Sequence, residues 1–147
     1  MTEALGRRRN GVHVFPVRVY YEDTDAGGVV YYANYLKFAE RARTDLLRNL
    51  GIEQSRLAAE AGVVFVVRRC AADFLQPARL DDGLEVHTGV VDIKGAAVNF
   101  IQSVRRDGDE LVRMDVQIAC MKSTVPGRPV RVPARIRTAF EAWRNAI

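Results

Sequence analysis

Histidine and cysteine are scarce in this chain, which has two of each among its 147 residues. Cys70 and Cys120 form no C-x-x-C pair, and with two distant histidines they match no zinc-ligand spacing. We therefore expect neither a metal site nor a disulfide. A Ser-His-Asp triad or a cysteine nucleophile also has little support. His13 and His87 are better explained as structural or surface histidines, and neither cysteine has a catalytic cue beside it.

Long apolar runs are absent as well. No stretch approaches the roughly 20 apolar residues that a membrane-spanning helix needs. The N-terminal Arg7-Arg8-Arg9 is not followed by an apolar segment, so it does not indicate a secretory signal peptide. Together with two unpaired cysteines, which suit a reducing compartment, these features predict a cytoplasmic protein.

Charge is not concentrated in blocks. A net charge of +4 and a pI near 9.4 would tolerate an anionic ligand without identifying one. The basic residues are scattered and no RNA-binding aromatic motif is present, so nucleic-acid binding is not expected. A hydrophobic content of 48% over this length is enough for one domain with its own core.

The order of the periodic segments predicts a single α+β domain. Residues 1–11 are polar and aperiodic and are expected to form a disordered basic lead, so that the domain covers 12–147. Residues 12–21 alternate as a strand, with an irregular or edge portion at Pro16, which cannot donate to a ladder. Four more strands are expected at 63–74, 84–92, 96–106 and 110–122, and short helices at 54–60 and 134–144. A long helix after the first strand, followed by an antiparallel run, predicts that the helix covers one face of the sheet.

The long helix is expected between Asn34, as N-cap, and Gly51, as C-terminal stop. Its period is near 3.6, and the residues assigned to its apolar face are Leu36, Ala39, Arg43, Leu46, Leu47 and Leu50. Asp45 is assigned to the other faces. For Arg43, on the apolar side, snorkelling to solvent is favoured over pairing with a carboxylate at the active-site end.

Residues 20–35 contain the strongest chemical signal. Glu22, Asp23 and Asp25 precede the adjacent Gly27 and Gly28, and aromatic residues then lead into the long helix. Glycines let a ligand approach the backbone closely, and the free N–H groups of a helix start suit a developing oxyanion. Asp25, nearest the glycines, would serve beside them as a base or nucleophile. From the residues alone, an acidic turn with a Gly-Gly reversal is the favoured explanation, because most Asp-x-x-Gly turns have no further role.

The same stretch resembles a known family. Residues 21–36 are similar to the signature of the hot-dog-fold acyl-CoA thioesterases, of the 4-hydroxybenzoyl-CoA thioesterase type and its bacterial branch associated with the Tol–Pal envelope system. The resemblance continues through 40–44, 65–68 and 77–82. It implies a five-stranded antiparallel sheet wrapped around a long central helix. It also implies acyl-CoA hydrolysis, with Asp25 as the catalytic carboxylate and the backbone N–H of Tyr32 polarising the thioester carbonyl. Many members of the acyl-CoA branch have His where this chain has Tyr32, which leaves the acyl group open.

The expected substrate-binding residues lie in two segments. Gly28 and Val29 belong to the glycine loop, and Val66, Val67, Arg68 and Arg69 belong to the predicted strand 63–74. The two arginines are expected to face either the phosphates of coenzyme A, or solvent and a partner subunit. No cofactor is expected, because coenzyme A is part of the substrate.

A homodimer or homotetramer is expected, because a five-stranded sheet around one helix leaves edge strands open to pairing. The strand 63–74 is the expected pairing edge, and in the family the acyl-CoA site lies between subunits. Association with cell-envelope or lipid-synthesis proteins is a further expectation. A hot-dog hydratase or dehydratase is less favoured, because no histidine lies between Asn34 and Gly51. A non-catalytic acyl-CoA-binding module is the third alternative.

Overall fold

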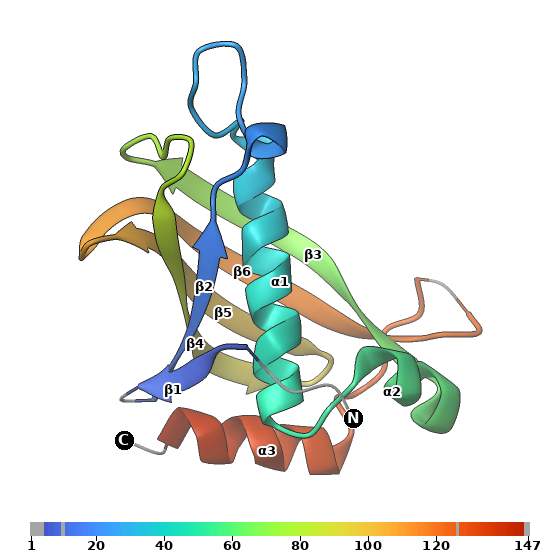
Figure 1. Ribbon diagram of the computed structural model, residues 1–147. Helices are drawn as coiled ribbons and strands as arrows, with labels where there is room; N and C mark the ends of the chain where they lie inside the picture. The colour runs from blue at the N-terminus through green and yellow to red at the C-terminus, as the bar shows by residue number, and fades with distance from the viewer. Residues whose placement is uncertain (1–4, 10, 126, 146–147) are drawn as a thin grey trace.

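The computed structural model describes residues 5–9, 11–125 and 127–145, and its main feature is an antiparallel sheet curved around one long helix (Figure 1). In chain order the elements are β1 (Arg7–Arg9), β2 (Val12–Arg18), the 3-10 turn η1 (Tyr21–Asp23), α1 (Ala33–Asn49), α2 (Gln54–Ala61), β3 (Val63–Phe74), β4 (Gly83–Lys94), β5 (Ala97–Arg106), β6 (Asp109–Lys122) and α3 (Ala134–Asn145). The strand order is β1-β2-β4-β5-β6-β3. The α+β class and the sheet around a central helix are as predicted.

The central strands alternate as the sequence predicted. Along β5 every second side chain is buried, namely Val98, Phe100, Gln102 and Val104. The β5–β6 hairpin turns at Asp107 and Gly108, both with positive φ, as an Asp-Gly turn requires. On the inner face the sheet packs on α1, and α3 crosses the end of the domain, where Phe140 meets Phe100 edge to face. The buried residues therefore form one core between the sheet and the helices.

Helix α1 differs from its prediction at both the cap and the buried face. It begins at Ala33 after Tyr32, so Asn34 is not its N-cap, whereas Gly51 follows its end with positive φ as expected. Leu36 is 45% exposed, although it was assigned to the apolar face. Asp45, assigned to the polar faces, is buried. The buried face of α1 therefore includes Asp45, which the 3.6-residue periodicity of apolar residues does not predict.

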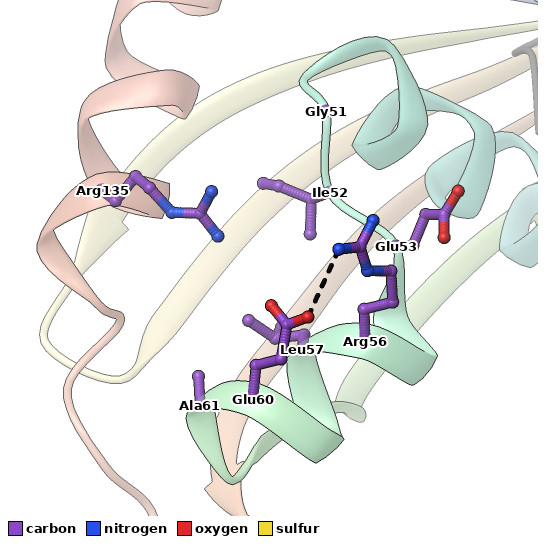
Figure 2. A pocket seen from close by; sticks show the side chains of 8 residues that line it. All are labelled: Gly51, Ile52, Glu53, Arg56, Leu57, Glu60, Ala61 and Arg135. Carbon is purple, nitrogen blue, oxygen red and sulfur yellow. Dashed lines mark hydrogen bonds and ion pairs between the residues drawn. The ribbon is translucent and has the colours of Figure 1, made fainter. Parts of the chain in front are cut away.

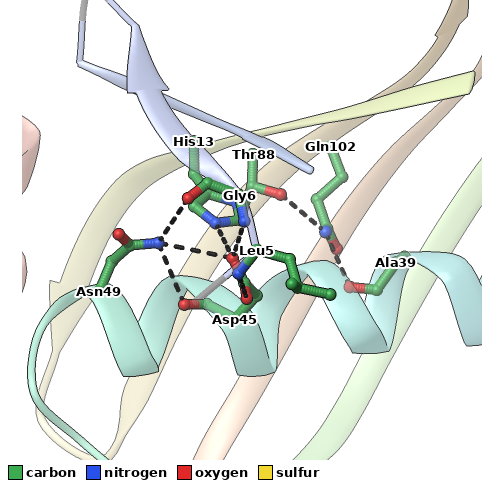
Figure 3. Close-up of polar contacts among 8 residues, drawn as sticks. All are labelled: Leu5, Gly6, His13, Ala39, Asp45, Asn49, Thr88 and Gln102. Carbon is green, nitrogen blue, oxygen red and sulfur yellow. Dashed lines mark hydrogen bonds and ion pairs between the residues drawn. The ribbon is translucent and has the colours of Figure 1, made fainter. Parts of the chain in front are cut away.

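Asp45 is buried because it binds the N-terminal segment (Figure 3). Its carboxylate accepts hydrogen bonds from the backbone N–H groups of Leu5 and Gly6, each at 2.7 Å, and lies 2.8 Å from Nε2 of His13. A Cβ at Gly6 would lie 2.5 Å from this imidazole nitrogen, so only glycine fits there. The cluster joins α1, β2 and the residues before β1.

The predicted disordered lead is wrong where the structure describes it. Arg7–Arg9 form β1, which pairs with Val12–Val14 of β2 and makes six strands where five were expected. Residues 1–4 and 10 lie outside the described residues. Since β1 pairs no further than Val14, Pro16 has a ladder partner only on the β4 side, in agreement with its predicted edge position.

Strand β3 forms the edge opposite β1. It pairs with β6 alone, with a bulge between Val67 and Arg69. Its side chains from Val66 to Ala71 are all exposed. The predicted edge strand is therefore confirmed as an edge. Within the described ranges no helix is both long and apolar enough to cross a bilayer.

Candidate active site

The acidic-glycine stretch forms a loop that projects beyond the start of α1 (Figure 1). Asp23 closes its base. The Asp23 carboxylate accepts the N–H of Tyr20 at 2.8 Å, and its carbonyl accepts the N–H of Tyr31 at 2.9 Å and the side-chain amide of Asn34 at 2.8 Å. Asp23 is 9% exposed, so it serves the loop's structure and is not available to a substrate.

Asp25 lies at the tip of this loop with its side chain exposed. Its N–H donates to the carbonyl of Val29 at 2.9 Å, and its own carbonyl accepts the N–H of Gly28 at 3.0 Å. Oδ1 accepts the N–H of Gly27 at 2.8 Å. Gly28 has φ +79°, which explains why glycine stands there. One carboxylate oxygen is thus oriented by the backbone, while Oδ2 has no hydrogen bond within the described chain.

Tyr32 immediately precedes the first turn of α1. The first N–H groups of a helix have no carbonyl acceptor within the helix itself. The loop reaches it along a short ribbon, because Thr24 bridges to Val30 and Asp25 is bonded to Val29. The glycine loop, which contains Asp25, is therefore joined by backbone hydrogen bonds to the segment that leads into α1. Gly28 and Val29, predicted to contact substrate, belong to the same loop.

The segment between β3 and β4 supports the helix start. The N–H of Ala78 donates to the hydroxyl of Tyr35 at 3.0 Å, and the N–H of Val30 donates to the carbonyl of Ala78 at 2.8 Å. Burial raises the pKa of the Tyr35 phenol, so this hydroxyl stays neutral. In the same segment the pKa of Asp82 is lowered. Partial burial of its carboxyl opposes this shift, but the N–H of Arg79 and the guanidinium of Arg106 outweigh it.

Next to Tyr32 lies an apolar cavity of about 260 Å³, lined by Val30, Tyr32, Tyr35, Phe74, Leu75, Gln76 and Pro77. The ring of Tyr32 meets that of Phe74 edge to face at 5.9 Å. The sequence analysis did not assign Phe74 and Leu75 to the site. Both follow a strand end far along the chain, and only the fold brings them beside Tyr32.

Val66, Val67, Arg68 and Arg69 are exposed on the edge strand β3. Phe74 marks the end of β3 that reaches Tyr32, and at about 3.3 Å per residue the stretch from Val67 to Phe74 spans about 23 Å. These four residues therefore lie along β3 away from the end that reaches Tyr32, Arg69 by about 16 Å and Val67 by about 23 Å. Val66 and Val67 instead border a second cavity, between β3 and the middle of α1.

A third cavity, of about 170 Å³, lies between α2 and α3 (Figure 2). Arg56 and Glu60 form an exposed ion pair across its wall at 3.3 Å, and Arg135 of α3 reaches in from the other side. None of the predicted site residues lines it. In the described part of the chain no group of three or more His, Cys, Asp or Glu side chains is arranged to hold a metal ion.

Comparison with known proteins shows the family of this chain. The family model described as thioesterase-like superfamily matches residues 19–140. The acyl-CoA thioesterase YbgC of Haemophilus influenzae is 48% identical over 126 residues, which are 86% of this chain and 92% of that protein. The acyl-CoA thioester hydrolase YbgC of Escherichia coli is 43% identical over 128 residues, 86% of this chain and 94% of that protein.

Solved structures agree as well. The crystal structure of a probable thioesterase from Bartonella henselae superposes with a TM-score of 0.79 at 38% identity, over 83% of this chain and 99% of that one. The structure of a 4-hydroxybenzoyl CoA thioesterase has a TM-score of 0.82 at 21% identity, covers 87% of this chain and 97% of that one, and supports the fold alone.

Proposed function

The chain belongs to the thioesterase-like superfamily, as a hot-dog-fold acyl-CoA thioesterase of the YbgC type, and from that premise we propose that Asp25 carries out the hydrolysis. The observation that carries this proposal is the loop geometry. Asp25 is exposed, is oriented by the Gly27 N–H, and stands in the same hydrogen-bonded unit as the start of α1.

Thioester hydrolysis needs few catalytic groups. The carbonyl carbon of the thioester is attacked by a water that Asp25 deprotonates, or by the Asp25 carboxylate itself, in which case water then cleaves the resulting anhydride. The backbone N–H of Tyr32, at the positive end of the helix, stabilises the charge that develops on the carbonyl oxygen. The C–S bond then breaks and its electron pair leaves on the thiolate of coenzyme A, a leaving group good enough to need no strong general acid.

A second copy of the chain completes the site in this proposal. The loop with Asp25 projects from its own domain, and Val66 to Arg69 lie on an edge strand too far along β3 to serve it. If β3 pairs with β3 of another copy, the sheets become continuous and each β3 approaches the partner's Asp25 loop. Val66 and Val67 then contact the acyl group, and Arg68 and Arg69 lie where the coenzyme A phosphates can bind.

The experiment is an assay of free thiol release from a panel of acyl-CoA thioesters, with the wild type and Asp25→Asn. The asparagine Oδ1 still accepts the Gly27 N–H, so we expect fold and acyl-CoA binding to persist. Turnover should fall by several orders of magnitude, as for loss of an essential base or nucleophile.

The matched control is Glu22→Gln, which removes an exposed carboxylate from the same stretch and should change turnover little. Near-normal turnover of Asp25→Asn would contradict the mechanism. Binding without any thiol release by the wild type would favour the acyl-CoA-binding module instead. A cytoplasmic location and association with cell-envelope or lipid-synthesis proteins remain predictions.

A further inference from the structure

The cavity between α1 and β3 contains a partly buried cation, Arg43, that the proposed hydrolysis does not use. It measures about 340 Å³. Its lining is mostly apolar on the strand side and polar on the helix side, and consists of Leu47, Phe65, Val66, Val67 and Ile118 with Glu40, Arg43, Thr44 and Gln54. Arg43 is partly buried there, and its guanidinium also donates inward to Gln102, a contact that the predicted snorkelling to solvent does not include.

Arg43 is held by a neutral partner whose orientation is fixed. Its Nη1 donates to Oε1 of Gln102 at 2.8 Å. Gln102 is fully buried, and its amide nitrogen donates to the carbonyl of Ala39 at 3.0 Å and to Oγ1 of Thr88 at 2.9 Å (Figure 3). Because both acceptors face the amide nitrogen, only the amide oxygen is left for Arg43. The guanidinium is therefore positioned by the core.

The charge of Arg43 is not neutralised by an ion pair. No carboxylate of the described residues lies within 4.0 Å of its guanidinium, although Glu40 is close enough to act on it through space. Burial lowers the pKa of Arg43, opposed by the charge of Glu40, and an arginine remains protonated nevertheless. Of its five N–H donors one is used within the protein, and no Arg43 nitrogen is among the sealed, unpartnered buried atoms of the described chain.

An unneutralised cation on the wall of an apolar cavity fits a ligand that has an apolar body and an anionic end. We infer that Arg43 binds a carboxylate on the acyl group, so that the enzyme prefers ω-carboxyacyl thioesters to unsubstituted acyl thioesters of the same length. The methylene chain lies against Leu47, Phe65 and Ile118. This inference rests on the proposed function, because Val66 and Val67 join this cavity to the edge that faces the partner's Asp25.

Substitution of Glu40 tests whether charge in this cavity controls the preference for a carboxylate-bearing acyl group. It lies on the same cavity wall, one helical turn before Arg43, and bears the charge that a carboxylate ligand would also bear. Replacing it by glutamine removes repulsion toward that ligand and leaves the size of the side chain unchanged. A carboxylate-binding role for Arg43 therefore predicts opposite effects for Arg43→Gln and Glu40→Gln.

The test compares kcat/KM for matched pairs of ω-carboxyacyl-CoA and straight-chain acyl-CoA of equal carbon number, over several lengths. Loss of a charge-assisted hydrogen bond should lower the ratio of the two values by about tenfold to a hundredfold in Arg43→Gln. Glu40→Gln should raise the ratio, and Arg43→Lys should keep part of it. Arg48→Gln, an exposed arginine of the same helix, should leave the ratio at the wild-type value.

The outcomes separate this inference from the proposed function. If wild type hydrolyses the straight-chain members and never prefers a carboxyacyl partner, the inference is wrong and the hydrolysis stands. If Arg43→Gln lowers both kcat/KM values by one common factor, Arg43 only supports the fold, and the inference is again wrong. If no pair at any length is hydrolysed, the proposed function fails and this inference fails with it.

Discussion

At the scale of single residues, three neighbouring carboxylates have different environments. Asp23 is buried and binds the loop base, Glu22 is exposed on η1, and Asp25 is exposed at the loop tip with one oxygen oriented. The sequence favours Asp25 by its position next to the glycines and by family resemblance. It does not distinguish Asp23 by burial, because the groups that bond to Asp23 come from both sides of the loop.

His13 gives a residue-scale prediction for stability. Burial lowers its pKa, with the hydrogen bond and charge of Asp45 opposing, and Nδ1 has no partner in the described chain. The folded state therefore takes up the proton less readily than the unfolded state, whose histidine has the ordinary pKa of 6.5. The stabilisation is full above that pH and is lost as pH falls below it.

We expect the free energy of unfolding of the wild type to decrease from pH 6.5 toward pH 5, by at most about 1.4 kcal/mol per pH unit for one proton. Urea unfolding across this range measures it. In His13→Gln this part of the pH dependence should disappear, although the variant is less stable at pH 7. An equal slope in both proteins would show that His13 is not the group responsible.

At the scale of secondary structure, the strands and short helices could be predicted because each has one clear period. Segments 63–74, 96–106 and 134–144 agree with β3, β5 and α3 to within a residue. The errors fall where tertiary contacts override the period. Asp45 is buried because Leu5, Gly6 and His13 bind it, and Arg7–Arg9 form a strand because β2 offers a free edge. The partners of Asp45 lie 32 to 40 residues away in sequence, whereas β1 pairs with the nearby β2, Arg9 with Val12.

The exposed edge of β3 gives the element-scale prediction. Val66 is 40% exposed on a strand that has a ladder partner on one side only. If β3 pairs with a second copy, Val66→Glu places a carboxylate in an apolar interface. The molar mass of the oligomer in solution and the thioesterase activity should then decrease together. Light scattering and thiol release measure the two quantities on the same sample.

Val125→Glu is the matched control. Val125 is 46% exposed, but it lies after the end of β6 and outside β3, so the substitution should change neither quantity. Full activity in a monomeric Val66→Glu protein would place the site within one chain. An unchanged mass would show that β3 is not the interface.

At the scale of the whole molecule, the predicted site residues lie in two places, Asp25 and Tyr32 at the start of α1 and Val66 to Arg69 near the middle of β3. The sequence predicts both sets as site residues, Asp25 with Tyr32 and Val66 to Arg69, because each lies in a recognisable local pattern, and their roles stay predictions. The sequence does not predict the distance between the two sets, because that distance depends on how β3 runs relative to α1. Phe74 and Leu75, which line the cavity beside Tyr32, were missed for the same reason. The proposed site between two copies would account for the separation of the two sets of residues within one copy.

The most direct test of this account is the activity per subunit of the wild-type enzyme, measured with its mass over a dilution series. We predict a mass at an even multiple of 16.4 kDa wherever the enzyme is active, and a loss of thiol release per subunit as dilution produces the single chain. Full activity per subunit in a species of 16.4 kDa would contradict a site formed between two copies.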